Sequence, residues 1–234
     1  MIEVIKGTTT PLSDMGVAAG ICWNAPTEDD KENIRRAMDC IESGHGRVEE
    51  FPDITVAISE YSARCIRELY THIVGTTRLQ ESTRYVNCEN FKFYEPDMDS
   101  AAAKRVYEGI MDDIKDAYAA LIEAGVSKED AANVLPLGMH TKIVWKVNVR
   151  ALEHFANMRL CARAYKEIRA LARELKKTLA KYSPEWKTLT DAIMVPKCKK
   201  ELFCTEKRCC GAAPKKSTVA KALEHYKNSQ DDGK

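Results

Sequence analysis

The sequence predicts an α+β protein in which a small mixed or antiparallel sheet is covered by long helices. Two observations predict this class. Long stretches carry apolar residues at helical spacing, and a few short stretches alternate apolar with polar residues. The alternating stretches are not consecutive along the chain, which is typical of the α+β class. With 234 residues and 44% apolar side chains, the chain can bury one substantial core.

Three segments are predicted to be strands because their apolar or aromatic residues alternate with polar or small ones. They are residues 54–58, 86–94 and 141–147. A short apolar stretch at residues 2–5 precedes a turn. The polar segment from Thr76 to Tyr85 is expected to connect a helix to a strand.

Four long helices are predicted, over residues 27–43, 61–72, 100–125 and 149–181, and a shorter capped segment is expected to begin at Ser127. A capping box, Thr27 with Asp30 three residues later, opens the first, and Ser100 opens the third. Asn148 can cap the last helix, which is the longest, and Pro184 is expected to end it.

Composition limits the possible partners and compartments. The net charge is +1, so no global charge points to nucleic acid or to an anionic membrane as the main partner. No basic-then-apolar leader and no membrane-length apolar run are visible, and we expect a soluble cytoplasmic protein with reduced cysteines. The main domain is expected over residues 1–190, followed by a basic, Cys-rich appendage over residues 191–234 with a short terminal helix.

The appendage contains four clustered cysteines, Cys198, Cys204, Cys209 and Cys210. Four thiolates could complete a tetrahedral zinc site. The spacing lacks the paired CxxC of well-specified zinc sites, which favours reduced thiols without a ligand. We therefore predict no metal.

The polar segment from Thr76 to Tyr85 is the densest group of functional side chains in the chain. Its hydroxyl, amide and guanidinium groups could bind a ligand rich in carbonyls and phosphate, because arginine offers a forked donor. A polar loop whose arginines pair with Glu68 or Glu81 explains the same composition equally well. The pattern by itself leaves both interpretations open.

The order Gln80-x-Ser82-x-Arg84-Tyr85 resembles the end of the signature RHRxxSx(N/S)(E/Q)xSxRY of the flavin-dependent thymidylate synthases. Three further segments resemble that family in order and spacing. They are Ser43-Gly44-His45-Gly46, the block VLPLGMHTKIVWKVNVRALEHFANMR over residues 134–159, and Glu167-Ile168-Arg169. The likeness covers roughly residues 10 to 190 in one register, and the chain is identified as a divergent member of this family.

The resemblance implies a conversion of dUMP to dTMP, with FAD as cofactor, methylenetetrahydrofolate as carbon donor and NADPH as reductant. It also implies a homotetramer whose active sites lie at subunit interfaces. Arg150 and Arg159 fit this expectation, since nine residues at about 100° each place them on opposite faces of one helix. Both can reach active-site ligands only if neighbouring chains share the sites.

The resemblance also assigns residues to roles. Ser82 matches the serine next to the uracil, Arg84 the arginine that binds the nucleotide, and Gln80 the position beside it. Arg159 resembles the arginine that contacts and polarises the pyrimidine. The positions that match FAD contacts are His45, Glu50, His72, Asn148, Arg150 and His154.

Two departures from the family put the phosphate partner of the nucleotide in question. Both arginines of the RHR element are missing, and Ala132 stands where many members place a phosphate-binding arginine. We expect Arg78 to take over one lost charge. The departures leave two alternatives: a flavin enzyme that makes another C5-modified pyrimidine, such as hydroxymethyl-dUMP, or a catalytically lapsed homologue that binds nucleic acid.

Overall fold

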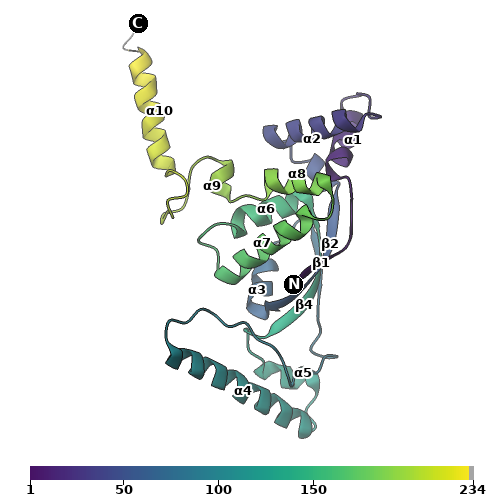
Figure 1. Cartoon of the computed structure of the whole chain (residues 1–234), viewed down its shortest axis with the longest axis vertical. Coiled ribbons are helices and arrows are strands. Elements are labelled where there is room, and N and C mark those ends of the chain that lie inside the picture. The colour runs from purple at the N-terminus through teal and green to yellow at the C-terminus, as the bar shows by residue number, and fades with distance from the viewer. Residues whose placement is uncertain (232–234) are drawn as a thin grey trace. The chain divides into compact units, whose positions relative to one another are not determined.

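The computed structural model describes residues 1–231, which form two compact units, one over Met1–Ala151 and one that begins at Leu152. The first unit contains one antiparallel sheet in the order β1-β2-β4-β3 (Figure 1). Its strands are β1 Ile2–Gly7, β2 Asp53–Ser62, β3 Thr76–Gln80 and β4 His140–Asn148. The predicted α+β class is confirmed.

One face of this sheet is buried because the register aligns the apolar positions of β2 and β4. Val56 pairs with Trp145 and Ile58 with Ile143, and all four side chains are buried. Helix α3 (Ala63–Leu69) packs against both strands. The alternating pattern at residues 54–58 and 141–147 therefore predicted these two strands correctly.

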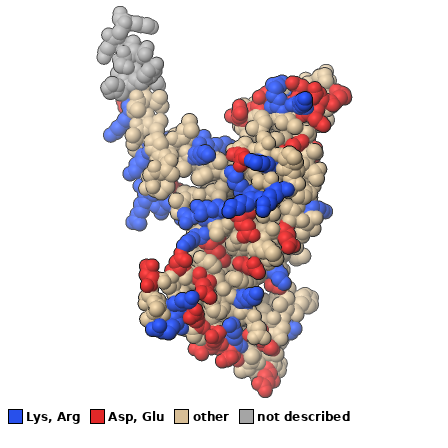
Figure 2. Space-filling model, viewed as in Figure 1, with Lys and Arg blue, Asp and Glu red and all other residues tan. Residues whose placement is uncertain are grey.

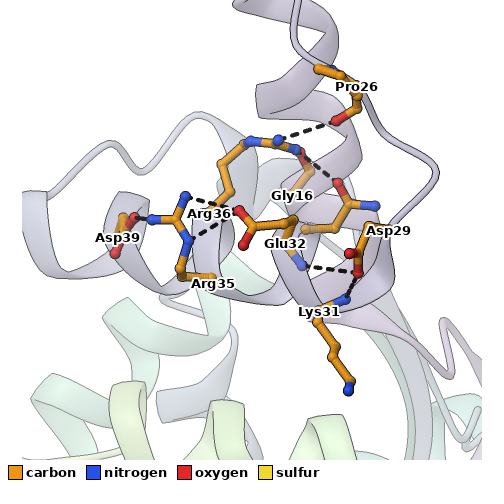
Figure 3. Close-up of polar contacts among 9 residues, drawn as sticks. Gly16, Pro26, Asp29, Lys31, Glu32, Arg35, Arg36 and Asp39 are labelled. Atoms are coloured by element: carbon orange, nitrogen blue, oxygen red, sulfur yellow. Dashed lines mark hydrogen bonds and ion pairs between the residues drawn. The ribbon is translucent and has the colours of Figure 1, made fainter.

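A helical hairpin of α1 (Pro11–Cys22) and α2 (Asp30–Ser43) is held by a buried arginine (Figure 3). The Arg36 guanidinium donates hydrogen bonds to the Gly16 carbonyl at 3.0 Å and to the Pro26 carbonyl at 3.1 Å. Burial of a guanidinium is costly unless its N–H groups find acceptors, and these carbonyls supply them. Arg36 thus joins both helices to the connection between them.

The start of α2 differs from the predicted capping box. Asp29, not Thr27, is the N-cap residue, and its carboxylate accepts hydrogen bonds from the Lys31 and Glu32 amides (Figure 3). Asp29 has the extended backbone of an N-cap, and a carboxylate there is favoured by the helix dipole.

Three helices after α2 begin at the serines that cap them. They are α3, capped by Ser62, α4 (Ala101–Glu123), capped by Ser100, and the short α5 (Lys128–Ala131), capped by Ser127. The predicted start of the third helix at Ser100 is therefore confirmed. Two 3-10 turns, η1 (Val48–Glu50) and η2 (Ala132–Val134), complete the helical elements of the first unit.

The strand predicted over residues 86–94 is wrong. This segment makes one isolated bridge, between Phe93 and Met139, and its aromatic residues pack against α4 instead. The Phe93 and Tyr107 rings lie edge to face with centroids 5.9 Å apart. Phe91 and Met111 belong to the same small core, so the alternation reflects a packed irregular segment.

The second unit is helical, and its elements are α6 (Val149–Arg159), which starts in the first unit, α7 (Lys166–Ala180), α8 (Pro184–Ile193), α9 (Lys197–Lys200) and α10 (Lys216–Asp231). The expected terminal helix is present as α10. The single helix predicted over residues 149–181 is wrong, because a turn separates α6 from α7. Arg169 donates to the Ala162 carbonyl of this turn at 2.7 Å. Pro184 opens α8 as its first residue. Within residues 1–231, no helix has the length and apolarity that a bilayer crossing requires.

Candidate functional site

Asn148 fixes one end of the sheet. Its backbone amide donates to the Gly75 carbonyl at 3.0 Å, and its side-chain oxygen accepts from the Ala151 amide at 2.9 Å. Asn148 therefore ends β4 and caps α6 at the same time, as its position in the sequence predicted. Gly75 has a φ of +72°, and a Cβ there would lie 2.6 Å from the Asn148 side chain, so only glycine fits.

An ion pair lies beside this end of the sheet. The Arg150 guanidinium contacts the Glu50 carboxylate, and Arg47 approaches the same carboxylate at 3.2 Å. The hydrogen bond from Arg150, aided by the charge of Arg47, lowers the pKa of Glu50. A Cβ at Gly46 would lie 3.4 Å from the Arg150 Nε, so the turn that carries the exposed His45 passes close to this pair.

Four of the predicted cofactor residues therefore come together, namely His45, Glu50, Asn148 and Arg150. His72 lies just before β3. Its carbonyl accepts a hydrogen bond from the hydroxyl of Thr76, the first residue of that strand, at 2.8 Å. The His72 side chain is buried. His154 is exposed on α6, four residues after Arg150 and on the same side of that helix.

The first half of the polar segment is a strand, not the expected loop. Residues Thr76–Gln80 form β3 at the edge of the sheet and pair with β4. Arg78 is engaged within this strand and the loop before it. Its guanidinium lies 4.5 Å above the Tyr70 ring and donates to the His72 carbonyl at 3.0 Å. Arg78 thus fastens the 70–76 loop to the sheet edge.

The predicted substrate residues Ser82 and Arg84 lie in the turn after β3, and Gln80 is the last residue of that strand. The Ser82 hydroxyl accepts from the Arg84 amide at 3.3 Å, and the Gln80 amide donates to the Thr141 hydroxyl at 3.3 Å. The Arg84 guanidinium is 63% exposed and pairs with Glu129 of α5 at 3.1 Å. Its partner is therefore neither Glu68 nor Glu81.

The cofactor and substrate groups lie apart within the first unit. Gln80 pairs with Ile143, which is five residues before Asn148 on β4. At ~3.4 Å per residue, that is about 17 Å along the strand. Arg159 belongs to the second unit, where it lines a hollow with Cys161 and Cys198.

A hollow of about 610 Å³ lies next to the Gln80 end of the sheet. Its charged side chains and its histidine are Glu60, Glu81, Glu89, Lys92, His140 and Lys142. The His140 Nδ1 atom is buried without a hydrogen-bond partner, and burial lowers the pKa of this imidazole. Sequence reasoning missed His140 as a site residue, although it lies inside the block that resembles the family.

Among the described residues, no three His, Cys, Asp or Glu side chains are placed to hold a metal ion. The donor set at the Asn148 end suits an organic anion instead. It combines the Arg150 and Arg47 guanidinium groups, the His45 imidazole and the N-terminus of α6.

Comparison with known proteins agrees with this geometry. A family model described as Thy1, thymidylate synthase complementing protein, matches residues 3–185. A flavin-dependent thymidylate synthase of Geobacter sulfurreducens is 34% identical over 78% of this chain and 83% of its own length. One of Nitratidesulfovibrio vulgaris is 31% identical over 93% of this chain and 97% of its own, and one of Pyrococcus furiosus is 30% identical over 88% and 89%.

The fold and the site define an α+β protein with a group of cationic and polar side chains at one end of its sheet. The chain belongs to the thymidylate synthase complementing protein family.

Proposed function

We propose that this protein converts dUMP to dTMP as an FAD-dependent enzyme, with methylenetetrahydrofolate as carbon donor and NADPH as reductant. The observation that carries the proposal is the convergence of Glu50, Asn148 and Arg150 at the start of α6. The names of the relatives, flavin-dependent thymidylate synthases, support the same activity.

The Asn148 end fits FAD because its groups suit a pyrophosphate and a ring system with carbonyls. Arg150 offers a forked cationic donor, and Glu50 holds that donor in place. The free amides at the start of α6 favour an anion. Close contact between Gly75 and Asn148 keeps the loop and the helix start together. When bound, FAD supplies reducing equivalents to the carbon being transferred.

His45, His72 and His154 complete the proposed FAD contacts. The His45 turn lies over Arg150, so its imidazole can approach the same ligand from the opposite side. His154 follows one turn after Arg150 on an exposed position of α6. The backbone of His72 fixes the start of β3, and we propose that this segment borders the cofactor.

Ser82, Arg84 and Gln80 are proposed to hold the nucleotide, with Arg159 polarising the pyrimidine. Cationic and hydrogen-bond donors on the pyrimidine carbonyls stabilise negative charge that develops at C5. Arg84 is exposed and paired with a single exposed carboxylate. It can therefore leave this ion pair and bind a phosphate at little cost in free energy. Arg78 adds local positive charge in the segment that lacks the RHR arginines.

The active form is proposed to be a homotetramer in which neighbouring chains share each site. Arg150 and Arg159 point to opposite faces of α6, and the cofactor and nucleotide groups of one chain lie apart on the sheet. The face of the sheet that α3 leaves open also exposes apolar side chains. Leu79 is 75% exposed, and Val144 is exposed beside it on β4. Such a surface suits contact with a second copy.

Three broader assignments are also proposals. We propose that residues 1–190 carry catalysis and that residues 191–234 form an appendage. Nucleic acid is not proposed as the main partner, since the net charge is only +1 and acidic and basic side chains are intermixed over α2 and α4 (Figure 2). The buried thiols of Cys40, Cys65 and Cys88 suit a reducing compartment, and we propose the cytoplasm.

The purified chain tests this function through its flavin content and its product. We expect a flavin absorbance band and dTMP formation from dUMP, methylenetetrahydrofolate and NADPH. A C5-modified product other than dTMP would support the alternative that the missing RHR arginines and Ala132 suggest. Absence of both flavin binding and dUMP binding would leave only the lapsed-enzyme alternative.

A further inference from the structure

Five thiols of the second unit lie near one another and are not used by the proposed function. Cys198 interacts electrostatically with Cys161, Cys209 and Cys210, and Cys204 interacts with Cys209 and Cys198. Four of the five line a hollow of about 390 Å³, namely Cys161, Cys198, Cys204 and Cys210. These thiols come from the turn after α6, from α9 and from the segment before α10.

Within this group, Cys204 and Cys209 form a pair. Cys204 is buried and fixed by its backbone, because its amide donates to the Pro214 carbonyl at 2.7 Å and its carbonyl accepts from the Lys216 amide at 3.0 Å. Cys209 is half-buried, and its sulfur contacts the carbonyl of Ala213, the residue before Pro214. One short segment therefore holds both cysteines, and their thiols influence each other's ionisation.

The Cys209 sulfur accepts one hydrogen bond and donates another. The Gly211 amide donates to it at 3.4 Å, and Gly211 has a φ of +89°, which favours glycine. In its protonated form the Cys209 thiol donates to the Ala213 carbonyl at 3.3 Å. The Gly211 hydrogen bond, the Cys204 thiol and the charge of Lys215 lower the pKa of Cys209.

Cys204 differs from its neighbour. A hydrogen bond from the Glu206 backbone lowers the pKa of Cys204, but burial and the neighbouring Cys209 outweigh it and raise that pKa. Cys209 is therefore the thiol that ionises first and is also the more accessible of the two. These are the properties of an attacking thiol next to a resolving thiol.

We propose that Cys204 and Cys209 form a redox-active dithiol that exchanges with low-molecular-weight disulfides, with Cys209 as the attacking thiol and Cys204 as the resolving thiol. The Cys209 thiolate attacks one sulfur of a disulfide RSSR, a mixed disulfide forms, and RS⁻ leaves and takes a proton from water. Cys204 then loses its proton and attacks the Cys209 sulfur, and the second RS⁻ leaves. The pair is oxidised by two electrons, and RSSR becomes two RSH.

The full-length protein, reduced and freed of reductant, tests this with glutathione disulfide at neutral pH, followed by intact mass and peptide mapping. We expect a Cys204–Cys209 disulfide without a retained adduct in the unaltered protein. Cys204→Ser should keep one glutathione on Cys209. Cys209→Ser should react at least about tenfold more slowly at this site. Cys22→Ser, which removes an exposed thiol in the first unit, is the matched control and should behave like the unaltered protein.

The peptide map of the unaltered protein does not depend on any variant folding correctly. A disulfide between other cysteines, or an adduct on Cys198 or Cys210 in Cys204→Ser, would overturn the assignment. Tightly bound zinc in the isolated protein would also overturn the assignment if the thiols react only after a chelator removes the metal. The cysteine group would then be a metal site.

Discussion

The two ends of the sheet differ in how firmly they hold their functional groups. At the Asn148 end, the side chain of Asn148 caps a helix, a glycine packs against it, and Arg150 is held by Glu50. At the other end, Arg84 is held by one exposed ion pair on an irregular turn. A single chain thus preforms the proposed cofactor contacts, whereas the proposed nucleotide contacts would be completed by the ligand and, in the proposed tetramer, by a neighbouring chain.

The strongest test of this difference is Arg150→Ala. Loss of a charge-assisted contact costs about 1.5 to 3 kcal/mol, which corresponds to a roughly 10- to 150-fold weaker binding of FAD. Titration of the apoprotein by flavin fluorescence measures it. Arg47→Ala is the matched control, since Arg47 is more exposed and contacts the same carboxylate, and it should change FAD affinity far less. An equal loss of FAD affinity in both variants would show that Arg150 contributes only to the local positive charge and makes no specific contact with FAD.

Gly75→Ala should destabilise the Asn148 end by about 2 kcal/mol or more, because the new methyl group meets Asn148 and the backbone needs a positive φ. Gly44→Ala shares the positive φ but has open space around the added methyl, and should cost about 1 kcal/mol. Urea unfolding of both variants separates crowding from backbone strain. If Gly75→Ala lowers the free energy of unfolding no more than Gly44→Ala does, Asn148 is not tightly packed against Gly75.

Arg84→Ala should raise the KM for dUMP roughly tenfold while FAD affinity stays unchanged, because Arg84 lies away from the Asn148 end. Stability should change by less than about 1 kcal/mol, since the pair with Glu129 is exposed. Arg78→Ala tests the expected charge replacement in the same assay. If it lowers stability and leaves both ligands bound normally, Arg78 only fastens the loop through Tyr70 and His72.

The smallest expected effect concerns pH. Burial lowers the pKa of His140 below the usual 6.5, so the unfolded chain takes up a proton that the folded chain does not. The free energy of unfolding should therefore fall as pH decreases through 6.5 towards the folded pKa. His140→Gln should remove that part of the slope in denaturant titrations between pH 7 and pH 5. An unchanged slope would show that His140 is solvated.

The sequence predicted strands and helices where one periodicity was clear, as in β2, β4 and α4. It missed β3 because Thr76–Gln80 is an edge strand with a polar composition. It missed the break between α6 and α7 because the turn contains no glycine or proline and is fixed by Arg169, a contact that no local pattern reveals.

Predictions of the site depended on the resemblance. The residues by themselves predicted only that Asn148 caps a helix. The structure shows the cap, and it also shows the carboxylate of Glu50 that holds Arg150, 100 residues away in the sequence. His140 was missed because its burial depends on the packing of the 86–94 segment, which the sequence misread as a strand.

The most direct test of the central claim mixes two impaired chains, Arg150→Ala and Arg159→Ala, after dissociation and reassembly, at an FAD concentration that loads the unaltered protein but not Arg150→Ala. If neighbouring chains share each site, some sites in the hybrids contain both arginines, and dTMP formation should rise well above that of either variant. Each variant reassembled alone is the control and should keep its own low activity. Hybrids that form, as shown by native mass spectrometry, but are no more active than the two variants would contradict the shared site.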